Sequence, residues 1–85
     1  MIMSKVEWKM QGNYLIREFR FPDFVSAINF INQVAELAEN QNHHPDILLH
    51  NYNQIEIRLT SHQKKRVTEK DIQLASAIDK INTSS

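Results

Sequence analysis

The sequence predicts an α+β fold, a two-layer ββαββα sandwich in which a four-stranded antiparallel sheet carries two helices on one face. Three features indicate this fold. Two pairs of short extended segments each flank a turn, a longer amphipathic segment follows each pair, and the last extended segment alternates apolar with polar residues. The 85 residues are expected to form a single domain, 1–85, with a frayed tail at 82–85.

The first hairpin is predicted around Gly12, the only glycine of the chain, which lies in a Gln-Gly-Asn turn. Extended segments are expected from about Lys5 to Met10 and from Tyr14 to Phe21. In the second segment Phe19 and Phe21 fall on one face while Glu18 and Arg20 fall on the other, as in a strand that is buried on one side.

A helix is predicted to begin at Pro22 and Asp23, because proline suits a first helical turn and an acidic residue there complements the helix dipole. Its end is expected within 39–42, since Pro45 disfavours helical geometry at the residue before it. Two apolar stripes run side by side along it: Phe24, Ile28, Ile31, Ala35 and Ala38, and then Ala27, Phe30, Val34 and Leu37. So wide an apolar face indicates either a deeply buried helix or a helix that packs in part on another subunit.

The second hairpin is predicted from segments 47–50 and 54–60, with a turn at 51–53. Isoleucine and leucine alternate with polar residues in the second segment, so the sheet is expected to be covered on one side only. A last helix is expected to begin at Thr68, with Asp71 completing a variant of the capping box. Its inner stripe is expected to be Ile72, Ala75, Ile78 and Ile81.

Composition excludes several kinds of site. The chain has no cysteine, and therefore no disulfide, thiolate metal site or cysteine nucleophile. Ten basic and ten acidic residues cancel, and the short basic run at 64–66 is expected to be a solvated loop, so no nucleic-acid partner is predicted. No apolar segment approaches the roughly 20 residues that span a bilayer, and the first residues do not resemble a secretory signal. We expect a cytoplasmic protein without a membrane partner.

Polar residues capable of chemistry fall near the ends of the predicted elements. Glu39 ends the first helix, His43 and His44 follow it, His62 follows the last strand, and Asp71 lies in the first turn of the last helix. Side chains at such ends can converge on one pocket. Imidazole both donates and accepts protons near neutral pH, so general acid–base chemistry is one interpretation and merely exposed histidines are the other.

No metal site and no serine nucleophile are predicted. His43 and His44 are adjacent and precede a proline, whereas a helical metal site needs histidines one turn apart. Ser61 and His62 are adjacent positions of an extended segment, so their side chains are expected to point apart, and no nucleophile elbow is visible.

The spacing of these residues resembles that of the pterin-4a-carbinolamine dehydratase family. The pattern is an acidic residue, three residues, His-His-Pro, six residues, Tyr, nine residues, His, eight residues and Asp. In this chain it is formed by Glu39, His43, His44, Pro45, Tyr52, His62 and Asp71. Trp8 and the stretches REFRFPDF and DIQLASAID add to the resemblance, which covers about residues 8 to 81.

The resemblance implies a hydro-lyase, 4a-hydroxytetrahydrobiopterin dehydratase. Its reaction is the dehydration of a 4a-hydroxytetrahydropterin to the quinonoid dihydropterin and water, in the recycling of the pterin that aromatic amino acid hydroxylases use. The resemblance implies no metal and no bound cofactor. It implies that His43, His44 and His62 share the acid and base roles, and that the following residues bind substrate or support the site: Glu39, Pro45, Tyr52, Ser61, Asp71 and Trp8.

Several of these residues have structural alternatives. Pro45 is expected to fix the geometry of the histidine segment, and Tyr52 to pack on or cap the hairpin turn. Trp8 is expected in the core or in the pocket wall. Asp71 is expected to hold the start of the last helix, and it could also orient His62.

Two further residues leave open questions. Glu39 is expected either to bond the pterin or a histidine, or to end a solvated helix. Arg66 stands where family members often have glycine, so a positive φ there would strain the loop.

Two other functions stay open from the sequence. One is a non-catalytic dimerisation or coactivator-type module, as some relatives are, and the other is a pterin-related role in molybdenum-cofactor metabolism. A homodimer or homotetramer is expected, through a strand edge or the face of the first helix.

Overall fold

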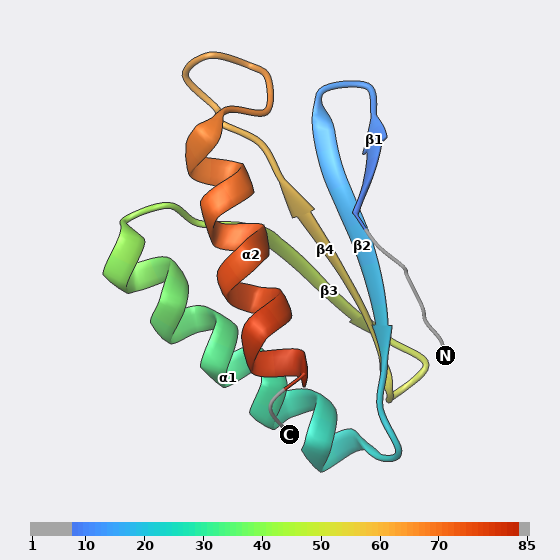
Figure 1. Cartoon of the computed structure of the whole chain (residues 1–85). Helices are drawn as coiled ribbons and strands as arrows, with labels where there is room; N and C mark the ends of the chain where they lie inside the picture. The colour runs from blue at the N-terminus through green and yellow to red at the C-terminus, as the bar shows by residue number, and fades with distance from the viewer. Residues whose placement is uncertain (1–7, 84–85) are drawn as a thin grey trace.

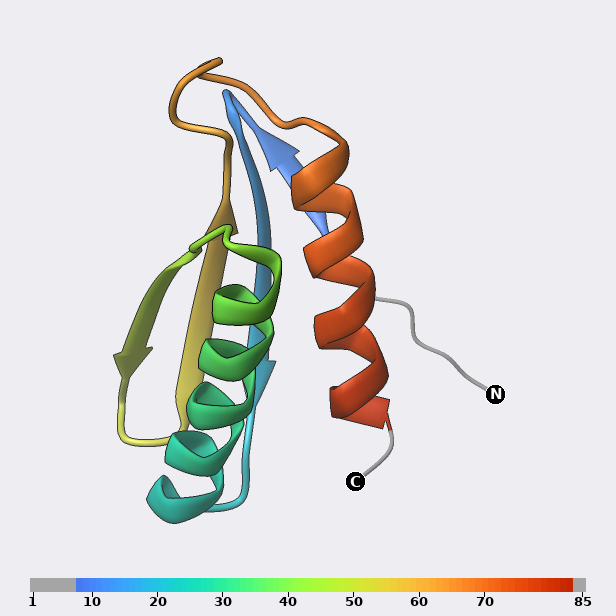
Figure 2. The same cartoon turned by 90° about the vertical axis from the view of Figure 1, so that its left-hand side faces the viewer.

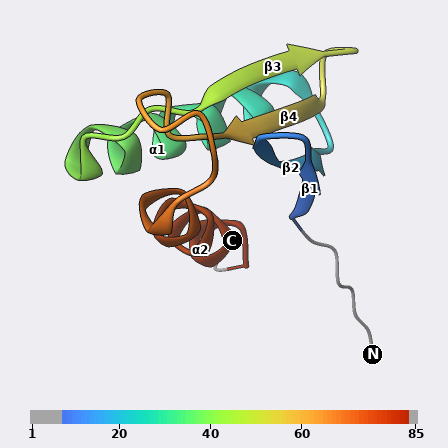
Figure 3. The same cartoon turned by 90° about the horizontal axis from the view of Figure 1, so that it is seen from above.

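The computed structural model describes residues 8–83. Its elements are β1 (Lys9–Gln11), β2 (Tyr14–Arg20), α1 (Phe24–Gln41), β3 (Asp46–His50), β4 (Gln54–Leu59) and α2 (Glu69–Thr83) (Figure 1). The strands form one antiparallel sheet in the order β1-β2-β4-β3. Figures 2 and 3 show both helices on the same side of this sheet. The predicted ββαββα sandwich is therefore confirmed.

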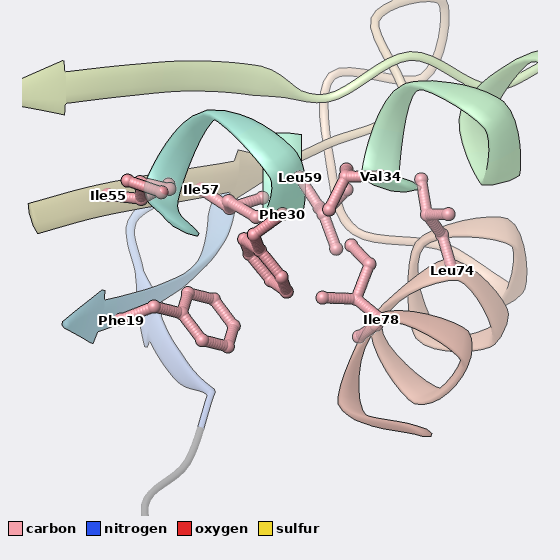
Figure 4. Close-up of a cluster of buried hydrophobic side chains, with 10 residues drawn as sticks. Phe19, Phe30, Val34, Ile55, Ile57, Leu59, Leu74 and Ile78 are labelled. Atoms are coloured by element: carbon pink, nitrogen blue, oxygen red, sulfur yellow. The ribbon is translucent and has the colours of Figure 1, made fainter. Parts of the chain in front are cut away.

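The core lies between the sheet and the two helices (Figure 4). Its largest members are Phe19 from β2, Ile55, Ile57 and Leu59 from β4, Phe30 and Val34 from α1, and Leu74 and Ile78 from α2. The aromatic rings of Phe19 and Phe30 pack with their centroids 4.9 Å apart. Burying each such side chain stabilises the fold by roughly 1.5–3 kcal/mol, so this cluster fixes how α2 lies against the sheet.

The inner face of α2 agrees with the predicted one at Ala75, Ile78 and Ile81 but differs at its start. Ile72 is 57% exposed, whereas Leu74 is fully buried. The buried positions are 71, 74, 75 and 78, which follow helical spacing and begin at the carboxylate of Asp71. The prediction followed apolar residues alone and missed this start of the buried face, because the first inward position of α2 is the charged residue Asp71.

Helix α1 begins at Phe24, two residues after Pro22, where it was expected to open. Asp23 is its N-cap, and its side chain accepts a hydrogen bond from the backbone N–H of Ser26 at 2.8 Å. Pro22 therefore precedes the cap instead of lying in the first turn. The buried positions of the helix are Ala27, Phe30, Val34 and Ala38. Of the first predicted stripe, Ala38 is buried and Ile31 packs against the core, whereas Phe24 and Ala35 are exposed.

The remaining boundaries lie close to the expected ones. Strand β1 is described from Lys9, and the expected strand residues 5–7 lie outside the described residues. Residues 82 and 83 are helical, so the predicted frayed tail is wrong at these two positions, and 84–85 are outside the description. Over residues 8–83, neither helix is long and apolar enough to cross a membrane.

Candidate functional site

The end of α1 fixes the backbone of His43. Asn42 has a left-handed backbone, with φ of 53°. Its N–H donates to the carbonyl of Glu39 at 3.2 Å, and the N–H of His43 donates to the carbonyl of Ala38 at 3.0 Å. These two bonds form a Schellman motif, and asparagine is one of the few residues that adopt the left-handed position readily. His43 therefore leaves the helix in a defined direction.

The carboxylate of Asp71 meets the imidazole of His43. Asp71 is fully buried, and its Oδ1 lies 2.5 Å from Nε2 of His43. Its Oδ2 accepts hydrogen bonds from the N–H of Thr68 at 2.8 Å and from the hydroxyl of Ser61 at 3.0 Å. The bond from Thr68 is the helix-capping interaction expected of Asp71. One carboxylate thus joins the start of α2, the end of β4 and the end of α1.

The structure has no hydrogen bond between Asp71 and His62, the contact that the sequence left as an alternative. His62 is exposed in the turn at 62–65, directly after Ser61, whose hydroxyl faces Asp71. His62 already belongs to the turn and is exposed, whereas Ser61 is buried against the carboxylate. The histidine that Asp71 contacts is His43.

His44 pairs with the other acidic residue of the pattern. Its Nε2 lies 2.8 Å from Oε2 of Glu39, and both side chains are exposed. Glu39 thus contacts a histidine while it also lies exposed in the last turns of α1, so both alternatives for it are present. Pro45 separates this pair from β3, which begins at the next residue, and it is half-buried.

A hollow of about 470 Å³ opens beside His43. The C-terminal end of α1, the loop after β4 and the N-terminal end of α2 surround it, toward one end of the sheet (Figure 1). Its lining residues are Asn42, His43, Ser61, Gln63, Lys64, Thr68, Glu69 and Lys70. His44 and His62 are not among them, but each is the chain neighbour of a lining residue.

Several lining residues were not expected at the site. Lys64 and Lys70 had no predicted role there, and Thr68 was expected only as a helix start. Asn42 carried a usable signal, because asparagine at the end of a helical pattern is typical of the left-handed position that turns the chain. Lys64 and Lys70 carried no such signal, since no sequence feature tells whether a surface lysine borders a hollow.

Tyr52 lies at the other end of the β3–β4 hairpin from the histidines (Figure 1). Five strand residues at about 3.3 Å each place roughly 17 Å between the two ends. Tyr52 lies in the hairpin turn at 51–53, and its side chain is 62% exposed. Within one chain the structure does not bring Tyr52 to His43 or His44.

Trp8 packs on the core and not on the hollow. Its ring meets Phe19 edge to face, with centroids 6.1 Å apart. Its indole N–H donates to both carboxylate oxygens of Asp79, at 2.9 and 3.1 Å, and Arg17 donates to the same carboxylate at 2.6 Å. These three polar side chains connect α2 to the sheet edge. The pocket-wall alternative for Trp8 does not hold for this hollow.

Arg66 does not take the conformation that would strain it. The left-handed residue of the loop is Lys65, with φ of 55°, whereas Arg66 has no positive φ. The carbonyl of Arg66 accepts a hydrogen bond from the N–H of Ser61 at 3.0 Å, which closes the turn. The left-handed backbone that was considered for Arg66 is therefore found at Lys65, the residue before it.

The acidic and imidazole groups of the site come as two pairs, His43 with Asp71 and His44 with Glu39. Among residues 8–83 there is no group of three or more histidine, aspartate or glutamate side chains arranged to hold a metal ion. The arrangement can hold a proton at a defined ring nitrogen next to a hollow of small-molecule size.

Comparisons with known proteins agree on one family. The family model described as pterin 4 alpha carbinolamine dehydratase matches residues 2–81. Relatives from Sulfurisphaera tokodaii and Chloroflexus aurantiacus, both provisionally named pterin-4-alpha-carbinolamine dehydratases, are 40% and 42% identical over 76 and 80 residues. The matches cover 89% and 94% of this chain and 81% and 85% of the relatives.

Solved structures extend the similarity to three dimensions. A protein from Brucella melitensis, described as a transcriptional coactivator/pterin dehydratase, superposes with a TM-score of 0.82 at 34% identity, over 87% of this chain and 80% of that one. A pterin dehydratase-like protein identified as a RuBisCO assembly factor of the alpha-carboxysome gives a TM-score of 0.68 at 20% identity, which shows the shared fold alone. From the family model, the relatives and the Brucella structure together, the chain belongs to the pterin 4 alpha carbinolamine dehydratase family.

Proposed function

We propose that this protein removes water from a 4a-hydroxytetrahydropterin and so yields the quinonoid dihydropterin, as a step of tetrahydropterin recycling. Membership of the dehydratase family supports a hydro-lyase of this kind. The observation that carries the proposal is the contact between His43 and the buried carboxylate of Asp71 beside the hollow. That contact gives an imidazole a fixed orientation at a place where a small molecule fits.

We assign His43 the role of the base. An ionised carboxylate only accepts hydrogen bonds, and Oδ2 of Asp71 already accepts from an N–H group. The proton in the contact at Oδ1 then belongs to Nε2 of His43, which leaves the lone pair on Nδ1. Because the side chain of His43 is nearly buried, this tautomer is held in place during the reaction.

The chemistry needs one proton donor and one acceptor. The bond between C4a and the hydroxyl oxygen breaks, the oxygen takes up a proton, and water leaves. A ring nitrogen gives its proton to the base, and its electron pair forms the new double bond to C4a. His44 and His62 are exposed and exchange protons with water, so they are the proposed donors to the departing hydroxyl.

The size and polarity of the hollow suit a pterin. Its volume of about 470 Å³ falls within the range of roughly 300–1,000 Å³ that small-molecule sites occupy. A pterin ring carries both hydrogen-bond donors and acceptors at its edge. The amides of Asn42 and Gln63 and the hydroxyls of Ser61 and Thr68 offer both kinds of partner.

The proposal is tested by the rate of dehydration of a 4a-hydroxytetrahydropterin. We expect the wild type to exceed the uncatalysed rate, and His43→Ala, His44→Ala and His62→Ala to lose on the order of 10²–10⁴-fold. Lys9→Ala, an exposed change on β1, is the matched control and should keep the wild-type rate. Circular dichroism checks that each variant is folded. A wild-type rate equal to the uncatalysed rate would reject the enzyme.

A binding module is the second candidate, and one observation favours it. Phe24 and Val25, at the start of α1, are both more than half exposed. Adjacent apolar side chains on a surface are typical of protein contacts. If the wild type is inactive while Phe24→Ser with Val25→Ser abolishes self-association in sedimentation, the module is the better description.

A further inference from the structure

Two lysines border the hollow, and neither has an acidic partner. Lys64 comes from the loop after β4 and Lys70 from the first turn of α2, and both are exposed residues of the lining. Neither forms an ion pair with an acidic side chain in the described part of the chain. Two ammonium groups from separate segments therefore meet at one hollow without a partner of their own.

Positive charge is concentrated in the segment that carries these lysines. The whole chain has ten basic and ten acidic residues, which cancel. Within 64–70, however, four residues are basic and one is acidic: Lys64, Lys65, Arg66 and Lys70 against Glu69. No ion pair of the described residues involves any of these four cations. Like charges held so close together repel one another, and an anionic ligand would offset that repulsion.

Lys70 occupies a helix position that does not favour a cation. It is the second residue of α2, which begins at Glu69. The first turn of a helix carries the positive end of the helix dipole, which favours acidic side chains and disfavours lysine. Its neighbours Glu69 and Asp71 follow this preference, whereas Lys70 does not. The helix itself therefore gives no reason for a lysine at this place beside the hollow.

The acidic groups near the hollow leave the lysines uncompensated. Asp71 is fully buried, and both of its oxygens have hydrogen-bond partners within the protein. Glu39 contacts His44 and is not one of the lining residues. Glu69 is the one acidic residue of the lining, against two lysines. The hollow therefore has an excess of positive charge.

We propose that the hollow binds a pterin whose side chain ends in a phosphate group, and that Lys64 and Lys70 hold this phosphate. This rests on the proposed function, and it narrows the substrate to a phosphorylated member of the same class. His43 lines the hollow from the end of α1, whereas the lysines line it from the loop and from α2. A ring that is held at His43 thus directs its side chain across the hollow to the lysines.

Lysine favours phosphate over carboxylate as the anionic group. A phosphate ester carries a charge of about −1.5 to −2 at neutral pH, which two ammonium groups match. Lysine binds phosphate as a point charge, whereas the planar fork of arginine is the better partner of a carboxylate. Arg66 is exposed in the same loop but does not line the hollow.

The affinities of three stable pterins test the proposal without any turnover. Hydroxymethylpterin, its phosphate ester and carboxypterin share one ring and differ in the charge of one substituent. We expect the wild type to bind the phosphate ester on the order of tenfold more tightly than the alcohol, as two exposed ion pairs provide. Carboxypterin should fall between them. The quenching of pterin fluorescence gives each Kd. A phosphate ester bound no more tightly than the alcohol, or than carboxypterin, would overturn the inference.

A double variant tests the two lysines. Lys64→Gln with Lys70→Gln removes both charges and keeps long polar side chains. The ratio of the Kd of hydroxymethylpterin to that of its phosphate ester should then fall toward one. Lys9→Gln with Arg20→Gln, at exposed positions of β1 and β2, removes the same number of charges and should keep the wild-type ratio. Equal losses in the two double variants would mean that net charge alone sets the preference, which would reject the site.

These binding measurements separate a failure of the phosphate site from a failure of the proposed function. A wild type that prefers the phosphate ester but does not dehydrate a 4a-hydroxytetrahydropterin would reject the proposed function and leave the phosphate site standing. An active wild type with a Kd ratio near one would reject the phosphate site alone. A wild type that binds none of the three pterins would reject both.

Discussion

His43 and Asp71 lie 28 positions apart in the chain, yet Nε2 of the imidazole is 2.5 Å from Oδ1 of the carboxylate. The contact joins the second residue after α1 to the first turn of α2, and Asp71 is fully buried. A buried carboxylate is stable only when its oxygens are satisfied, and here both oxygens have partners. The histidine at the hollow is therefore oriented by a group that the fold itself requires.

Asp71→Asn should separate orientation from folding. The amide keeps the size of the side chain but loses the charge that fixes the tautomer of His43. We expect kcat to fall by on the order of 10–100-fold and the free energy of unfolding to fall by about 1–3 kcal/mol. Steady-state kinetics and urea unfolding measure the two. Asp79→Asn is the matched control, because it removes the charge that pairs with Arg17 and one of the oxygens that accept from Trp8, and it should lose stability without losing kcat.

Asn42 offers a test of the backbone that positions His43. Asn42→Gly should keep the Schellman motif, whereas Asn42→Val should destabilise the protein by about 1–2 kcal/mol, because a β-branched residue resists the left-handed conformation. We expect the valine variant also to lose activity as His43 is displaced. Asn42→Gly further tells whether the amide side chain itself contacts the ligand. Equal stability of the two variants would contradict the motif.

The inward face of α2 gives a direct stability prediction. Leu74→Ala removes a fully buried side chain and should lower the free energy of unfolding by about 2–5 kcal/mol. Ile72→Ala, only two residues away, should change it by no more than about 0.5 kcal/mol because its side chain is largely exposed. Urea unfolding of the two variants, side by side, decides between the observed face and the one drawn from apolar residues alone.

The cap of α1 should make stability depend on pH at the acidic end. The backbone N–H of Ser26 donates to Asp23 and lowers the pKa of that carboxyl from its ordinary value of 3.8. Because the folded pKa is the lower one, the stabilisation is fully present above the unfolded value and is lost as pH falls through the folded value. Asp23→Asn keeps a capping side chain without the charge, so its stability should fall less between neutral and acidic pH. Urea unfolding across that range measures the difference, and parallel losses in both proteins would contradict it.

Patterning was sufficient for the element order but not for the partners within the site. The alternation in β4 and the turn at Gly12 are local signals, and they predicted the sheet. Which histidine meets Asp71 depends on how α1 and α2 pack, and no local signal reports that. The apolar pattern also did not show that Asp71 is an inward position of α2, because a charged residue interrupts an apolar stripe. Long-range geometry of this kind follows from the core, and it therefore became visible only in the folded chain.

Tyr52→Gly should separate strain from function at the hairpin tip. Glycine accepts a φ of 57° without the roughly 1–2 kcal/mol that a left-handed backbone costs other residues. That gain offsets the about 0.5–1 kcal/mol of flexibility that glycine adds to the unfolded chain. We therefore expect the free energy of unfolding to be unchanged or higher, while the rate of pterin dehydration falls at least about tenfold, as for a lost aromatic contact of about 1.4 kcal/mol. Tyr52→Phe keeps the ring and should retain most of the rate if stacking is the main contribution. A Tyr52→Gly variant as active as the wild type would mean that the ring contacts no ligand and that Tyr52 is not a site residue.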